Sequence, residues 1–488
     1  MTITDRSHRT SATYGGVSTG SEREIGPRHL WAAALVGVVA ATVAYWRTYE
    51  WAGAVGIDTW AYAAWGQAIE RGDVPQFYKS GTTPKPLAML LGTFAALMPA
   101  HVAMLLVMSV ALGGLAAGLF LAAARANGWA AAAAVGALIA SVGFESMFEL
   151  SDGVAAALVV ASVASRRWLR VGFLVAAGVM RPEAWILAGI AGWMAEAEPR
   201  RRILAAVGSA VAAPVLWMAA DVATMGDPLG TAHFLGWART RKLGGVPVPT
   251  DSVADVAREF ASLIWGTPLD AAVASAGIVG LVLIVIRRPR GLDAFPAIVA
   301  GVGALELFIL AVLATNMYER YLLPFVLTML GLGAGYLVGM VLGRVIIPVP
   351  AAAVIAAAAL VVWGSQLQLE GRRERATRMT ERVEASVGSL LQAVDCGRVG
   401  VLGNWRARDH LPVIAASARV PLQRLGVVRY DDAGRITNLE RFAAIVRLHS
   451  GYASIPSDWT RYSTELSPLA TRPGCTLPDT PLRIRRST

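Results

Sequence analysis

The sequence predicts an all-α polytopic membrane protein with about eleven transmembrane helices, followed by a small mixed α/β domain. Of 488 residues, 55% are hydrophobic and only 16% are charged, and the mean hydropathy of +0.51 is too high for a soluble protein. Long apolar segments recur through residues 29–364, whereas residues 365–488 are more polar. We therefore divide the chain into residues 1–28, a transmembrane domain of residues 29–364 and a C-terminal domain of residues 365–488.

The candidate transmembrane helices are runs of predominantly apolar residues. Roughly 20 such residues span a bilayer, and fewer suffice for a helix packed inside the protein. Two short runs are separated by Arg181-Pro182, and the stretch Pro86–Pro99 is too short to cross, so we expect it to be re-entrant or interfacial. The predicted spans are His29–Tyr49, Val102–Ala124, Trp129–Phe144, Gly153–Ser165, Leu169–Met180, Pro182–Met194, Ile203–Ala223, Leu269–Ile286, Leu292–Thr315, Tyr321–Leu342 and Val345–Gly364.

Arginine clusters predict the orientation of these spans, because cytoplasmic loops carry an excess of Lys and Arg. Residues 1–28 are rich in Ser, Thr, Gly and Arg and lack the apolar core of a signal peptide, so we expect a disordered cytoplasmic tail. If Pro86–Pro99 does not cross, one topology makes every arginine cluster cytoplasmic. These clusters are Arg125, Arg166–Arg170, Arg200–Arg202, Arg287–Arg290 and Arg344.

The same topology gathers the candidate functional groups on the outer face, in the loops 50–100 and 224–268 and at the helix ends beside them. All three lysines of the chain, Lys79, Lys85 and Lys242, lie in these two loops. The C-terminal domain is also expected outside, in an oxidising compartment. There Cys396 and Cys475 would either form a disulfide or remain two unpaired cysteines.

The formal net charge of +10 does not indicate nucleic-acid binding. Residues 365–488 hold 19 Arg against 12 Asp and Glu, which leaves about three net positive charges for the helical part. No basic stripe with interleaved aromatic residues occurs in that part. We exclude nucleic acid as a partner and expect the basic C-terminal domain to interact with anionic lipid headgroups.

The segment Gly56–Tyr62 places the carboxylate of Asp58 directly after the first span, at the outer face. Apolar residues in Asp58–Gly72 recur at the three-and-four spacing of an amphipathic helix, which we expect to lie along the membrane surface. Asp58 would lie near its amino terminus, where the helix dipole favours a carboxylate. Two interpretations stay open: an N-cap assisted by Thr59, or a general base that takes a proton from an acceptor hydroxyl.

Further charged residues flank the other outer helix ends. Asp152 opens an apolar helix and is either an N-cap or a charge facing the same cavity as Asp58. Arg181 is costly within a membrane unless it forms a salt bridge, for instance with Glu183, or grips a phosphate in a polar cavity. Lys85 is held in a stiff extended segment between two prolines. Lys85 or Arg320 would be able to neutralise a departing phosphate, although Arg320 also fits a snorkelling role.

In this order, the motifs resemble the polytopic membrane glycosyltransferases of the GT-C fold, which include protein O-mannosyltransferases and the aminoarabinose transferase that modifies lipid A. The resemblance covers about Trp31–Leu342. The family's Asp-Glu-x-x-Tyr-Ala signature reads Asp58-Thr59-Trp60-Ala61-Tyr62-Ala63, with Thr in place of Glu. Lys85-Pro86 resembles the family's Lys-Pro motif, but the acidic residue often found before it is absent, so no metal site is indicated. Other resembling elements are Asp152, Met180–Glu183, Gly226–Leu229 and Glu319–Pro324.

The resemblance implies an inverting transfer of sugar from a polyprenyl-phosphate-linked donor to a glycan, lipid or protein acceptor, on the extracytoplasmic face of the cell membrane. Asp58 would deprotonate the acceptor while basic residues stabilise the lipid phosphate. No cofactor is indicated, and a role for a divalent metal stays open. The predicted site residues are Asp58 and Asp152 for catalysis, and Tyr62, Lys85, Arg181, His233, Lys242 and Arg320 for substrate binding.

Two other functions remain as alternatives. Charged residues inside a helical bundle also occur in transporters and lipid flippases, although no inverted repeat is visible in this chain. A scaffold that presents the C-terminal domain is the second alternative. That domain has the apolar runs Val399–Leu402 and Val427–Val428 and a helix-like stretch Leu439–Leu448, and an acceptor-recognition role would suit it.

Overall fold

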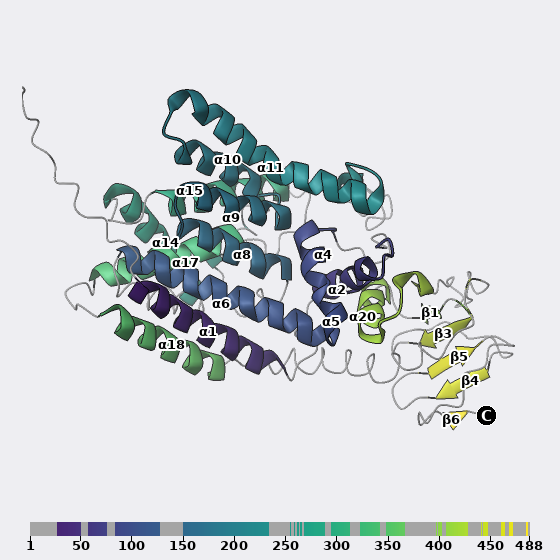
Figure 1. The fold of residues 1–488 in the computed structure, drawn as a ribbon. Helices are drawn as coiled ribbons and strands as arrows, with labels where there is room; N and C mark the ends of the chain where they lie inside the picture. Colours follow the sequence, from purple (N-terminus) through teal and green to yellow (C-terminus); the bar gives the residue numbers. More distant parts are fainter. Residues whose placement is uncertain are drawn as a thin grey trace, which may run out of the picture.

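The structure is a computed structural model in which helices form one body and the strands among the described residues lie in the C-terminal part (Figure 1). The residues it describes are 27–49, 57–75, 83–126, 150–233, 254, 258, 261–262, 264–265, 268–287, 294–312, 323–341, 348–366, 397, 399–402, 407–427, 441, 443–447, 460–463, 468–471 and 485–486.

Each predicted span that falls on described residues forms a helix, because its apolar run contains few residues that interrupt helical hydrogen bonding. The predicted span Trp129–Phe144 lies outside the described residues. The helices of the body are α1 (Pro27–Tyr49), α6 (Ala100–Ala126), α8 (Leu150–Val163), α9 (Arg167–Met180), α10 (Ala184–Ala195), α11 (Pro199–Met225), α14 (Pro268–Arg287), α15 (Phe295–Val312), α17 (Thr328–Val341), which follows the π-helical turn η3 (Leu323–Leu327), and α18 (Val349–Gln366).

Within the described residues, four helical segments are long and apolar enough to cross a membrane: Pro27–Trp46, Ala100–Ala123, Pro199–Met225 and Pro324–Val341. The remaining helices of the body include several shorter apolar ones. The chain is therefore a multi-pass membrane protein, and the total of eleven crossings stays a prediction. Pro182 lies at the break between α9 and α10, as expected for a residue that cannot continue a helix.

Small residues bring the helices of the body into close contact. At the crossing of α1 and α6, a Cβ atom added to Gly113 would lie 2.6 Å from the carbonyl oxygen of Gly37. Gly280 of α14 and Gly333 of α17 meet backbone to backbone in the same way. In a membrane, where lipid is as apolar as the side chains, such contacts supply the packing energy between helices.

The stretch Pro86–Pro99 forms two short helices, α4 (Pro86–Gly92) and α5 (Phe94–Leu97), beside α2 (Ile57–Glu70). The prediction of a short non-spanning segment agrees with this arrangement. The prediction that α2 is amphipathic, with one exposed polar face, is wrong, because every residue from Thr59 to Ala68 is buried. The physical reason is that α4 and α5 cover part of α2 and helix α20 (Ala407–Ala418) of the C-terminal part covers another. The position of α2 along the membrane surface stays a prediction.

The C-terminal strands form one six-stranded mixed sheet in the order β2-β1-β3-β5-β4-β6. β1 is parallel to its two neighbours, whereas the remaining pairs are antiparallel. The helix-like reading of Leu439–Leu448 is wrong for Ala444–Arg447, which form β3, because β3 pairs with β1 on one side and β5 on the other. The strands are β1 (Val399–Leu402), β2 (Leu425–Val427), β3 (Ala444–Arg447), β4 (Thr460–Ser463), β5 (Pro468–Thr471) and β6 (Arg485–Arg486).

Candidate functional site

Asp58 lies in the first turn of α2 with its side chain partly buried. The next residue, Thr59, is fully buried, and its Oγ1 accepts a hydrogen bond of 2.9 Å from the backbone N–H of Leu150. Leu150 begins α8, and the first N–H groups of a helix have no partner inside that helix. Thr59 therefore caps α8 from α2, which brings the start of the Asp58 helix to the start of the Asp152 helix. The sequence indicated that Thr59 would assist the N-cap of its own helix, and contained no sign that it caps α8.

Asp152 and Arg181, two predicted site residues, form a buried ion pair. A guanidinium N–H of Arg181 donates to Oδ1 of Asp152, and the side chains are 7% and 1% exposed, respectively. Arg181 lies at the break between α9 and α10, so the break presents its side chain to the start of α8. Glu183 is also near, with its Oε1 3.8 Å from the Arg181 guanidinium. The salt bridge considered for Arg181 thus exists, with Asp152 as the closer partner.

Lys85 joins this pair through a residue that sequence reasoning missed. Its Nζ donates a 2.8 Å hydrogen bond to Oγ of Ser151, and the Ser151 hydroxyl donates to Oδ1 of Asp152 at 3.2 Å. We call the set Lys85, Ser151, Asp152 and Arg181 the polar network. The one sequence signal for Ser151 was its place beside Asp152 at a helix start, where a hydroxyl is common.

The position of Lys85 is set by the backbone around it. Lys85 precedes α4 in an extended conformation (φ −132°, ψ 112°), as predicted for a residue between two prolines. The hydroxyl of Tyr62 donates a 3.1 Å hydrogen bond to the carbonyl oxygen of Thr83, two residues before Lys85. Tyr62 is buried and packs edge-on against Trp65, with ring centroids 5.6 Å apart. The predicted binding residue Tyr62 therefore holds the segment that carries Lys85.

The polar network places two cationic groups around one carboxylate at the ends of several helices. Asp152 orients the Arg181 guanidinium, a planar donor fork that matches a phosphate as well as a carboxylate. Lys85 supplies a second positive charge from a different segment. Such an arrangement is suited to holding an anionic group next to the start of α2. Within the described part of the chain, no three His, Cys, Asp or Glu side chains lie close enough to hold a metal ion.

The structure does not bring His233 to the polar network. Its Nδ1 lies 2.6 Å from Oδ2 of Asp227, and its side chain is 64% exposed. Gly226 ends α11 with a left-handed φ of 71°, and the Leu229 N–H donates to Asp227 Oδ1 at 2.9 Å. These contacts lower the pKa of Asp227 below its ordinary value, first through the Leu229 N–H and then through His233.

Two predicted binding residues, Lys242 and Arg320, lie outside the described residues, as do Cys396 and Cys475. Their predicted roles and the disulfide alternative therefore stay predictions.

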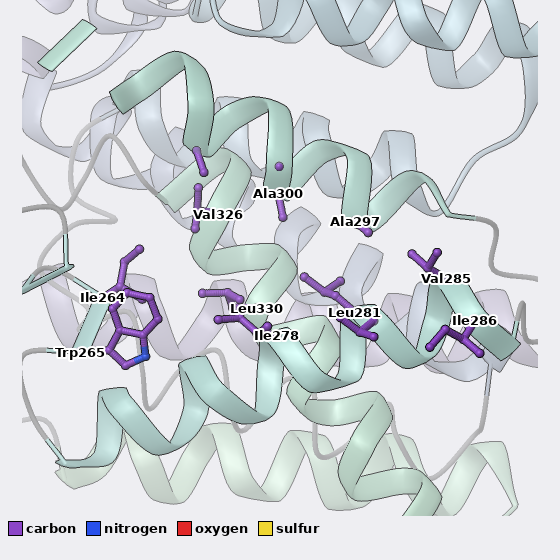
Figure 2. A pocket seen from close by; sticks show the side chains of 13 residues that line it. Ile264, Trp265, Ile278, Leu281, Val285, Ile286, Ala297, Ala300, Val326 and Leu330 are labelled. Carbon is purple, nitrogen blue, oxygen red and sulfur yellow. The ribbon is translucent and has the colours of Figure 1, made fainter. Parts of the chain in front are cut away.

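An apolar groove of about 410 Å³ runs between α14 and α15 (Figure 2). Figure 2 shows Leu281, Val285 and Ile286 of α14 facing Ala297 and Ala300 of α15 across it. The turn η3 contributes to the groove and also packs against α8, the helix of the polar network. The lining residues are Ile264, Trp265, Ile278, Leu281, Val282, Val285, Ile286, Ala297, Ala300, Gly301, Ala304, Val326 and Leu330.

Similarity to known proteins is visible in the fold alone. No protein-family model and no curated protein sequence matches the chain. The chain as a whole has a fold of the GT-C type. Among solved structures, the chain is similar to ArnT from Cupriavidus metallidurans bound to undecaprenyl phosphate, with a TM-score of 0.55 and 14% identity over 90% of this chain and 97% of that chain. For the apo state of the same protein, the TM-score is 0.50 with 14% identity, over 85% of this chain and 93% of that chain.

Proposed function

We propose that this protein is an inverting membrane glycosyltransferase, which transfers a sugar from a polyprenyl-phosphate-linked donor to a glycan, lipid or protein acceptor on the extracytoplasmic face. One observation carries the proposal. The polar network gathers Lys85 and Arg181 beside the start of the Asp58 helix. It does so in a chain whose fold resembles that of ArnT, solved with undecaprenyl phosphate.

Lys85 and Arg181 would bind the phosphate of the donor lipid. The phosphate carries negative charge before the reaction and more of it when the sugar–phosphate bond breaks. Positive groups that are already in place stabilise this developing charge without having to reorganise. In this proposal Asp152 and Ser151 are positioning residues, because they hold the Arg181 guanidinium and the Lys85 ammonium around one centre.

Asp58 would be the general base, because its partly buried side chain leaves access for an acceptor. Its carboxylate takes the proton of the acceptor hydroxyl, and the acceptor oxygen forms a bond to the anomeric carbon. The bond between that carbon and the phosphate oxygen breaks on the opposite face of the sugar, which inverts the configuration. The electron pair leaves with the polyprenyl phosphate, whose charge Lys85 and Arg181 stabilise.

The apolar groove between α14 and α15 would hold the hydrocarbon chain of the donor. Its lining is aliphatic apart from Trp265, and several of its side chains are exposed on the surface of the body. A polyprenyl chain in the groove would be buried against protein with almost no polar surface being desolvated. The turn η3 contacts both α15 and α8, which connects the groove to the helix of the polar network.

Membranes that contain the protein, supplied with radiolabelled polyprenyl-phospho-sugars and candidate acceptors, test this function. We expect product formation by the wild type and a loss of about a hundredfold or more in Asp58→Asn, the usual range for removal of a general base. Asp73→Asn is the matched control, because Asp73 lies just beyond the other end of α2, paired with Arg71 on the surface. Product formation unchanged in Asp58→Asn would refute the role of Asp58, and label that crosses the membrane without product would indicate a flippase.

A further inference from the structure

Gln67 is a buried polar residue that connects α2 to two other helices. Its side chain amide is enclosed, and the residue is only 3% exposed. The Nε2 atom donates one hydrogen bond of 3.0 Å to the carbonyl oxygen of Ala95 and a second of 3.2 Å to that of Ala416. The first acceptor belongs to α5 and the second to α20 of the C-terminal part.

Both acceptors are carbonyl groups of the last helical turn. The last four C=O groups of a helix have no hydrogen-bond partner inside that helix, and a buried one that stays unpaired is costly. The amide NH₂ of a Gln has two hydrogens, so both donor positions of Gln67 are used. Gln67 therefore caps the carboxyl ends of two helices that are more than three hundred residues apart in the sequence.

The contact between α2 and the C-terminal part extends beyond Gln67. Buried apolar residues of α20, among them Leu411 and Ile414, belong to the same hydrophobic cluster as Trp60 and Trp65 of α2. Near the end of α2, Nε2 of Gln423 donates a 3.4 Å hydrogen bond to the carbonyl oxygen of Val74. The core of the C-terminal part is therefore continuous with the core around α2 and is not separate from it.

The side of α2 next to Gln67, about 100° around the helix, is also closely packed. Gly66, the residue before Gln67, meets the backbone of Gly92 in α4, where an added Cβ atom would overlap backbone atoms. Asp58 lies nine residues earlier on the same helix, about 13 Å away at 1.5 Å per residue. A 14-residue helix transmits a shift or tilt at one end to the other.

We propose that Gln67 is a positioning residue that places Asp58 by joining α2 to α5 and to the C-terminal part, and that the C-terminal part is thereby a structural component of the catalytic unit. This inference rests on the proposed role of Asp58. The C-terminal part would then have a role besides the acceptor recognition expected from its sequence, because α20 packs against α2 and helps to fix its position.

Two substitutions in the full-length protein test the proposal. Gln67→Glu keeps the shape but sets a carboxylate oxygen against two carbonyl oxygens, and Gln67→Met keeps the length but removes both donors. We expect kcat per folded molecule to fall at least tenfold in both variants, while KM for the polyprenyl-phospho-sugar stays within twofold. Gln67→Asn, which retains a shorter amide donor, should recover part of the lost kcat.

Gln423→Glu is the matched control, because Gln423 also donates to a backbone carbonyl between the two parts but at an exposed position. Its kcat should equal that of the wild type. A contact that serves stability alone would lower the melting temperature of the Gln67 variants without changing kcat per folded molecule, and this result would overturn the proposal. Failure of all three Gln67 variants to accumulate as folded protein would overturn it as well.

The proposed function and this inference fail in different ways. Full transfer by Asp58→Asn would remove Asp58 as the base, whatever the Gln67 variants do. Loss of transfer in Asp58→Asn together with wild-type kcat in Gln67→Glu and Gln67→Met would leave the proposed function standing and refute the positioning role of Gln67.

Discussion

Asp152 at the start of α8 accepts a hydrogen bond from the guanidinium group of Arg181 at the break between α9 and α10, and both side chains are buried. Burying an unpaired charge costs free energy. The attraction between these two opposite charges offsets part of the desolvation free energy of both side chains. The ion pair also holds the Arg181 guanidinium near Lys85, which is linked to Asp152 through Ser151. Structural and proposed functional roles therefore coincide in one pair, and a double-mutant cycle can separate them.

For the ion pair, we predict that Arg181→Gln or Asp152→Asn alone lowers the free energy of unfolding by about 3–5 kcal/mol, because one buried charge loses its closer partner. The double variant should lose less than the sum of the two single variants. Thermal unfolding in detergent measures stability, and sugar transfer should be low in every variant that lacks Arg181. Additive losses in the cycle would contradict the coupling.

For the cap on α8, we predict that Thr59→Val lowers the free energy of unfolding by about 1 kcal/mol, because the buried N–H of Leu150 loses its acceptor. Thr59→Ser keeps the hydroxyl oxygen and should remain near the wild type. Hydrogen exchange at the Leu150 amide should accelerate in Thr59→Val but not in Thr59→Ser. Equal protection of this amide in both variants would show that Thr59 is not its cap.

For the crossing of α2 and α4, we predict that Gly66→Ala destabilises the protein by about 1–3 kcal/mol, because the new methyl group overlaps the backbone of Gly92. Gly208→Ala is the matched control, since a Cβ atom there meets nothing within 4 Å. It should leave stability unchanged or raise it slightly. Melting temperatures of the two variants provide the comparison, and a stable Gly66→Ala would refute close contact at this crossing.

For the apolar groove, we predict that Gly301→Phe weakens the use of long-chain donors. A side chain at position 301 has open space in front of it and would fill the groove. KM should rise at least fivefold for a donor with a full polyprenyl chain and stay unchanged for a donor with one or two isoprene units. Leu305→Phe, at an exposed position of α15 outside the groove, is the control. Equal effects on both donors would exclude the groove as the lipid site.

For the turn after α11, we predict that acid weakens the contacts of Asp227. Its folded-state pKa lies below the ordinary value of about 3.9. The stabilisation of the turn is therefore complete above that value and is lost as the pH falls through the lowered folded-state pKa. Hydrogen exchange at the Leu229 amide, corrected for the intrinsic pH dependence of exchange, should show this loss. In Asp227→Asn the corrected protection should no longer depend on pH, and a dependence that persists would refute the assignment.

The sequence correctly predicted those elements that depend on short stretches of chain. An apolar run of sufficient length becomes a helix, and α1, α6, α11 and α14 lie close to their predicted bounds. The α9–α10 break at Arg181-Pro182 was predictable for a different local reason, since proline lacks a backbone N–H and has a restricted φ. Three of the predicted site residues, Lys85, Asp152 and Arg181, meet in one network because charged groups in an apolar protein must find partners.

Interpretations that depended on distant partners were less successful. The helix-like pattern at Leu439–Leu448 contains β3, since pairing with β1 and β5 outweighs a local pattern in a central strand. The apolar spacing in α2 predicted one polar face, but α20 and the short helices α4 and α5 cover the helix. No local signal indicates which segments will cover an apolar helix.

By itself, the sequence determined the membrane class, the positions of most helices and the charged residues available for a site. The length of an apolar run and the geometry of proline act locally along the chain. The free-energy cost of an unpaired buried charge applies to every possible fold. Only the tertiary structure decided that Thr59 caps α8, that Ser151 links Lys85 to Asp152 and that Gln67 binds Ala416. These contacts join groups that are far apart along the chain, and the packing of the helices against one another determines which of them meet.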